Sequence, residues 1–196
     1  KVKSTPKKEH PGALSQQILR KAQSSLRPVP TNWVESVKLP SGTPRGEWII
    51  ASTEEFMNDL LMFFGSLSDF CTSSRCPKMT AGSSTEYLWC DGEVYKTITS
   101  ISAPKYIELL LEWAKKQLDS FPSEESRQGK KFVHQMCIVF KRLFRIYAHI
   151  YCNHFDRVQQ FGLELHLNMS FKRFVSCFFF FFSIFNHLTK FLKKKK

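Results

Sequence analysis

Apolar residues recur at helical spacing in four stretches of this 196-residue chain. The first, 14–26, ends at Arg27-Pro28-Val29-Pro30, a segment that cannot continue a helix. The second, 52–67, opens with an S-x-x-E pattern that is typical of a capping box. The third begins at Pro104 and runs to about residue 118, and the fourth and longest covers about 132–155. The pattern predicts a mainly α protein, a small helical bundle.

A short β element interrupts this helical pattern. The apolar runs 87–90 and 93–95 flank Asp91-Gly92, a dipeptide that strongly favours a tight turn between two strands. Residues 71–85 before them have no periodicity and read as an irregular loop. We therefore expect one small β-hairpin.

The formal net charge of +12 would normally indicate nucleic acid or an anionic membrane as a partner. Of the 29 basic and 17 acidic residues, segment 1–30 holds seven basic and one acidic, and segment 172–196 holds seven basic and none acidic. The middle, 31–171, is left with 15 basic and 16 acidic residues. A domain close to neutrality gives no electrostatic reason to expect a nucleic-acid partner.

The first eleven residues are polar and contain no apolar stretch of the kind found in a signal peptide. We therefore expect a cytoplasmic protein, and leave the nucleus open as a second location. In a reducing compartment the six cysteines are poor candidates for a disulfide framework, and clustered ones read better as metal ligands.

Cys71 and Cys76 form a Cys-x4-Cys pair, and 72 residues separate Cys76 from a His-x4-His pair, His149 and His154. Two thiolates and two imidazoles make a closed tetrahedral site, for which one structural zinc ion is the default. Positions five apart on a regular helix lie about 140° apart around its axis, so both rings can reach one ion only if the helix ends or distorts near residue 153. The alternative is that His149 is a hydrogen-bonded core histidine and His154 a surface one.

Lys141, Arg142 and Arg145 lie on one face of the 132–155 helix. Two guanidiniums and an ammonium group suit a phosphate dianion, because arginine offers a rigid bidentate fork. From periodicity alone, a solvated helix face is the simpler interpretation.

The segment 175–196 differs in kind, with five consecutive phenylalanines and four terminal lysines. Its apolar run is well short of the roughly 20 residues that span a bilayer. Runs of Phe and Lys are also what T-rich and A-rich nucleotide tracts encode, so we interpret the segment as an artefact of truncation or of the gene model. If the segment is genuine, its apolar and polybasic parts indicate a membrane-tethered scaffold.

Many ordered motifs across residues 6–174 resemble the MOB (Mps one binder) kinase-activator family. The resemblance implies a MOB/phocein-like helical bundle with a hairpin and a structural zinc ion held by Cys71, Cys76, His149 and His154. It also implies a non-catalytic co-activator of NDR/LATS-type kinases in Hippo-like signalling. The Lys/Pro-rich residues 1–13 are expected to be a basic mobile arm, and residues 14–174 the folded zinc-binding domain. The motifs are Leu19-Arg20-Lys21-Ala22, Val37-Lys38-Leu39-Pro40, Gly46-Glu47-Trp48-Ile49, Asp69-Phe70-Cys71-Thr72, Cys76-Pro77-Lys78-Met79, Ser102-Ala103-Pro104-Lys105-Tyr106, Lys141-Arg142-Leu143-Phe144-Arg145, Tyr147-Ala148-His149, His154-Phe155-Asp156 and His166-Leu167-Asn168.

Two binding surfaces follow from the resemblance. Glu47, Trp48 and Glu55 match the family surface that receives the basic N-terminal segment of an NDR/LATS-type kinase, with Glu55 expected to be exposed in the first turn of its helix. The alternative is that Trp48 belongs to the core and Glu55 is only a capping residue. A second set matches the family pocket for a phosphothreonine of an MST-type kinase, although Thr97 stands where many relatives have a further lysine: Lys141, Arg142, Arg145 and Lys96.

Two other functions compete with the adaptor. A zinc hydrolase needs an open coordination position and a general base such as Glu164, and the sequence contains no His-Glu-x-x-His motif. A membrane-tethered protein would use the 175–196 segment. The resemblance therefore favours an adaptor and not an enzyme.

Overall fold

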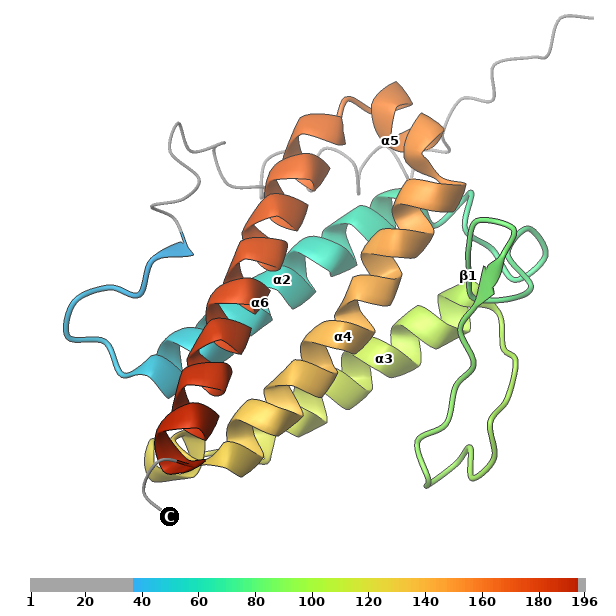
Figure 1. Ribbon diagram of the computed structural model, residues 1–196. Coiled ribbons are helices and arrows are strands. Elements are labelled where there is room, and N and C mark those ends of the chain that lie inside the picture. The colour runs from blue at the N-terminus through green and yellow to red at the C-terminus, as the bar shows by residue number, and fades with distance from the viewer. Residues whose placement is uncertain (1–36, 194–196) are drawn as a thin grey trace, which may run out of the picture.

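The computed structural model describes residues 37–193, and side chains up to residue 180 (Figure 1). The predicted helix at 14–26 and the arm at 1–13 lie outside these residues. The described part is mainly helical with one two-stranded sheet, which confirms the predicted fold class. Its elements are α2 (Arg45–Ser66), β1 (Thr80–Ala81), β2 (Thr85–Glu86), α3 (Ala103–Asp119), the 3-10 helix η2 (Glu125–Arg127), α4 (Lys130–Asn153), α5 (Phe155–Gln160) and α6 (Glu164–Lys193).

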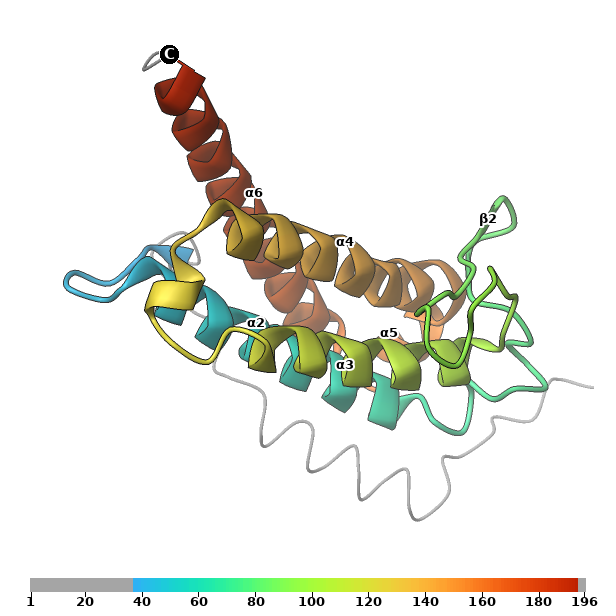
Figure 2. The ribbon, with the colours of Figure 1, turned by 90° about the horizontal axis from the view of Figure 1, so that it is seen from below.

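Helix α4 is the centre of the bundle and packs against α2, α3 and α6. Figure 2 shows α2 and α3 side by side, with α4 lying over them. The core between these helices is rich in aromatic rings: Phe56 meets Phe174 edge to face at 5.4 Å between centroids, and Trp89 meets Tyr106 at 5.2 Å. Such pairs add about 0.5–1.5 kcal/mol each beyond their buried area, so they fix the relative positions of the helices.

Helix α2 begins at Arg45, seven residues before the predicted capping box. The predicted start of this helix is therefore wrong. Pro44 precedes its first turn, where the missing N–H of proline does no harm. Thr53 lies inside the helix, where its hydroxyl donates to the Ile49 carbonyl at 2.7 Å. The hydroxyl therefore bonds back to the preceding turn and does not cap a helix.

The β-hairpin exists but lies at 80–86, ahead of the predicted 87–95. Thr80 pairs with Glu86, and Gly82 supplies the left-handed turn conformation with φ of +69°. Asp91-Gly92 also turns the chain, yet the carboxylate of Asp91 accepts hydrogen bonds from the backbone N–H groups of Glu93 and Tyr95. These local bonds compete with a strand ladder, and the segment forms a long loop closed by a single bridge between Trp89 and Thr99.

Helix α6 continues past Phe174 without a break to Lys193, so the Phe-rich segment is helical. The side chains of Phe174 and Cys177 are buried against the bundle, whereas Phe179 is 63% exposed. No helix between residues 37 and 193 is long and apolar enough to cross a membrane.

Candidate functional site

The four predicted metal ligands meet at one end of the bundle. Cys71 follows α2, where its backbone N–H donates to the Leu67 carbonyl at 2.8 Å. Cys76 lies on the next turn of the same loop, and His149 lies in the last turns of α4. Two segments far apart in the sequence therefore face each other across the site.

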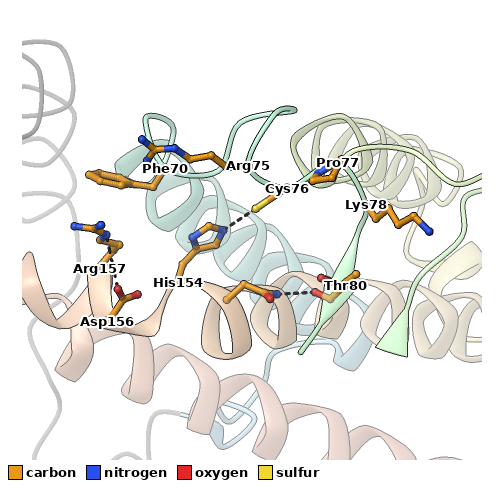
Figure 3. A pocket seen from close by; sticks show the side chains of 10 residues that line it. Phe70, Arg75, Cys76, Pro77, Lys78, Thr80, His154, Asp156 and Arg157 are labelled. Carbon is orange, nitrogen blue, oxygen red and sulfur yellow. Dashed lines mark hydrogen bonds and ion pairs between the residues drawn. The ribbon is translucent and has the colours of Figure 1, made fainter. Parts of the chain in front are cut away.

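The four predicted ligands bring their donor atoms close together. One donor atom from each of Cys71, Cys76, His149 and His154 lies within 4.8 Å of all the others. The Cys71 sulfur is 3.4 Å from His149 Nε2, and the Cys76 sulfur is 3.4 Å from His154 Nε2. Figure 3 shows His154 and Cys76 pointing toward one another. This cluster can hold a metal ion.

His154 reaches the site because α4 ends just before it. It is the residue between α4 and α5, with φ of −137° and ψ of 10°, outside helical geometry. Its backbone N–H still donates to Ile150 at 2.9 Å, while its carbonyl accepts the first bonds of α5. The predicted condition, a helix end near residue 153, is met.

Burial prepares the histidines for a metal. Desolvation lowers the pKa of His149, and it lowers the pKa of His154 to about 4, so both rings are neutral at neutral pH. His149 Nδ1 lies 2.7 Å from the Thr80 carbonyl, which fixes the proton on Nδ1 and leaves Nε2 for an ion. Desolvation, with the nearby Cys76, raises the pKa of the Cys71 thiol. A bound cation would reverse that effect by stabilising the thiolate.

A cavity of about 480 Å³ opens beside Cys76 and His154 (Figure 3). The guanidinium carbons of Arg157 and Arg75 lie 4.6 and 5.8 Å from the centroid of the Phe70 ring. Arg157 is also bonded to Gln160 at 2.9 Å and paired with Asp156 at 3.7 Å, the one carboxylate among the described residues of the wall against Arg75, Lys78 and Arg157. The wall of this cavity therefore carries positive charge next to the metal ligands.

The two arginines of the predicted basic site on α4 both lie against aromatic side chains. The Arg142 guanidinium lies 4.2 Å from the ring centroid of Trp113 and 5.4 Å from that of Trp89. Its Nη1 is buried and has no hydrogen-bond partner within the part of the chain that the structure describes. Arg145 donates to the hydroxyl of Tyr106 and lies 5.2 Å from the ring centroid of Tyr87. Both guanidiniums therefore rest on aromatic rings.

Lys141 is exposed and also lines an apolar groove between α4 and α6, together with Phe144 and Phe179. Lys96 is exposed on the loop that the Trp89–Thr99 bridge closes. Arg142 and Arg145 thus form the structured part of the predicted basic site, whereas Lys141 faces the groove with α6 and Lys96 lies on the loop.

The predicted acidic surface is engaged in ion pairs within the protein. Glu47 pairs with Arg127, and Glu55 pairs with Arg173 at 3.0 Å. Glu55 lies in the middle of α2 and is only 33% exposed, so the expected first-turn position is wrong. Trp48 is half-buried, with its ring edge to face with Phe180 at 5.5 Å.

Sequence reasoning missed the aromatic partners of the arginines and the polar partners of the histidines. The sequence predicts Trp89 as a strand residue and Trp113 as a core residue. Periodicity cannot show that an arginine side chain stacks on their rings. Asn153 Nδ2 donates to the Thr80 carbonyl at 2.9 Å and thereby holds the acceptor that His149 uses. In the sequence, the one signal for this role of Asn153 was its position directly before the predicted ligand His154.

The fold and the site define a small helical-bundle protein built around a Cys2His2 cluster. A model of the Mob1/phocein family matches residues 28–191, so the match continues beyond residue 174, the end of the motifs quoted from the sequence. A MOB kinase activator-like 1B from Medicago sativa subsp. falcata is 42% identical over 175 residues, 87% of this chain and 80% of the relative. The maintenance of ploidy protein mob1 from Schizosaccharomyces pombe is 45% identical over 146 residues, 72% and 70% of the two chains. The chain belongs to the Mob1/phocein family, whose members are adaptors and not enzymes.

Proposed function

We propose that the protein is a kinase co-activator that recognises a phosphothreonine of an MST-type kinase through Lys141, Arg142 and Arg145, with Lys96 at the edge. Several relatives carry the name MOB kinase activator-like, which supports the kinase connection.

One observation carries the phosphate site: Arg142 Nη1 is a buried donor without a partner in the described chain. Burial lowers the pKa of Arg142, and the positive charge of Arg145 acts in the same direction. A phosphate would supply both the missing acceptor and a compensating charge. The aromatic rings below hold the two guanidiniums in place and so reduce the entropy lost on binding.

The test is fluorescence anisotropy of the full chain with a labelled phosphothreonine peptide and its unphosphorylated twin. Charge-assisted hydrogen bonds contribute about 1.5–3 kcal/mol each, so Arg145→Ala should weaken binding about tenfold or more. Arg145→Lys should weaken it less, because lysine keeps the charge without the fork.

Lys131→Ala is the matched control, since Lys131 is an exposed cation elsewhere on α4. Circular dichroism of each variant checks the fold. Equal binding of the two peptides would reject the phosphate site and leave the arginines with a purely structural role.

For the kinase itself, we propose an NDR/LATS-type partner whose basic N-terminal segment contacts Glu47, Trp48 and Glu55. Arg127 and Arg173 already pair with the two glutamates, so the segment would have to compete with them. Charge complementarity then sets the association rate more than the affinity. Affinity capture of the full chain from a lysate, read by mass spectrometry, should enrich such kinases.

We infer that the metal is one structural zinc ion. Zinc bonds of about 2.3 Å to sulfur and 2.0–2.1 Å to nitrogen place the two donors about 3.6 Å apart in a tetrahedron. The two sulfur–nitrogen distances of 3.4 Å fit this value. Four protein donors leave no open position for a reacting water, so the ion supplies stability and no hydrolytic chemistry.

A second candidate, tethering to an anionic membrane, is favoured by the apolar groove of about 350 Å³ beside Lys141. The exposed rings of Phe144 and Phe179 and a lysine-rich C-terminus match the two signals of a peripheral anchor. Co-sedimentation with phosphatidylserine vesicles tests it, and a lack of binding at low salt would reject it.

A further inference from the structure

Another cavity, of about 290 Å³, lies between the 89–94 part of the long loop and the outer face of α3. Figure 1 shows this loop in green beside α3. The apolar part of the wall comes from Trp89, Trp113 and Leu109.

The rim of this cavity is acidic. Asp91, Glu93 and Glu112 contribute three carboxylates, against the single ammonium group of Lys116. Lys116 is paired with Glu112 at 3.3 Å. The cavity therefore has a net negative rim over an indole wall, a combination that favours a cationic side chain.

The same two tryptophans separate this cavity from the proposed phosphate site. The Arg142 guanidinium is 4.2 Å from the Trp113 ring centroid, and Trp113 also lines the cavity. An anion site and a cation site thus share one aromatic wall. An extended peptide advances about 3.3 Å per residue, so side chains one to three positions from a phosphothreonine at Arg142 sample sites within about 10 Å of it.

We propose that this cavity is a specificity pocket for a lysine or arginine side chain within three residues of the recognised phosphothreonine. The inference rests on the proposed phosphothreonine site. Phosphate contacts then provide the anchoring, and the pocket selects among phosphorylated sequences, partly by repelling acidic neighbours.

The test compares phosphothreonine peptides that carry Lys, Ala or Glu at each of the three positions on either side. Fluorescence anisotropy with the full chain should show, at one position or more, binding about fivefold tighter for Lys than for Ala, and weaker binding still for Glu. In the double variant Glu93→Gln/Glu112→Gln the preference for Lys should fall to about twofold or less, with phosphate dependence unchanged.

Glu124→Gln/Glu125→Gln is the matched control, because it removes the same charge in and next to η2, beyond the end of α3. It should keep the preference. Equal affinities for Lys and Glu peptides at all positions would overturn the pocket while leaving the phosphate site intact. An undiminished preference in the pocket variant would also overturn it. If no phosphopeptide binds at all, the proposed function fails and the pocket fails with it.

Discussion

The ring centroids of His149 and His154 lie 5.0 Å apart, although five positions on a regular helix would turn the two side chains about 140° away from each other. The end of α4 between them makes this possible, because His154 leaves helical geometry while its backbone still bonds to Ile150. The loop that carries Cys71 and Cys76 closes the cluster from the other side. The cluster thus joins two segments that lie far apart in the sequence.

Removing a ligand should therefore unfold this end of the protein. We expect Cys76→Ser and His149→Ala to lose the bound metal and most of the stability, since structural zinc contributes on the order of 10 kcal/mol in small peptide sites. Elemental analysis and thermal unfolding measure both effects. Cys152→Ser, at an exposed cysteine near the site, is the control and should change neither. A folded, metal-free wild-type sample would contradict the expectation.

The ion pair between Glu55 and Arg173 should contribute measurably to stability. The Arg173 side chain is 11% exposed, so Glu55→Gln leaves a buried guanidinium poorly compensated and should cost about 2 kcal/mol. Glu54→Gln breaks an exposed pair with Lys115 and should cost less than about 1 kcal/mol. Urea denaturation compares the two neighbours on α2. Equal small losses would show that the Glu55 pair is effectively solvated.

Gly46 is required by the close approach of α2 to η2. A Cβ atom at this position would lie 2.4 Å from Arg127 Cβ and 2.8 Å from the Arg127 carbonyl oxygen. Gly46→Ala should therefore destabilise the protein by about 1–3 kcal/mol, despite the better helix propensity of alanine. Gly129→Ala meets nothing within 4 Å and serves as the control in the same denaturation series. A stabilised Gly46→Ala variant would disprove the close packing.

Tyr151 should make stability depend on alkaline pH. Burial raises its pKa from 10.0 to about 12, and its hydroxyl donates to Asn168 at 2.7 Å. Because the folded state resists ionisation, this contribution is fully present below pH 10 and is lost as the pH rises toward about 12. Urea midpoints at pH 9 and pH 11 should differ less for Tyr151→Phe than for the wild type. An identical pH dependence would place the hydroxyl in water.

The sequence alone predicted the approximate positions of the helices, because a helix with one buried face repeats its apolar residues every three to four positions. The third and fourth predicted helices match α3 and α4 to within two residues. The spacing of Cys71, Cys76, His149 and His154 suggested a metal site but left core and surface histidines as an alternative, and the family resemblance favoured the ligand set.

Contacts between distant elements determine features that the pattern of apolar residues could not predict. The first turn of α2 contacts Arg127 through Gly46 and Glu47, 80 positions away from Glu47, and the local capping signal at Ser52 cannot show such contacts. The hairpin lies at 80–86 and not at the predicted 87–95. The Thr80 carbonyl accepts a hydrogen bond from His149, and the Asp91 carboxylate accepts one from the Tyr95 N–H within its own loop. The environment of Arg142 likewise follows from Trp89 and Trp113, which two separate segments bring to one helix face. Hydrophobic period is a property of one segment, whereas ion pairs, ring stacking and metal geometry depend on where distant segments meet, and only the tertiary structure determines that.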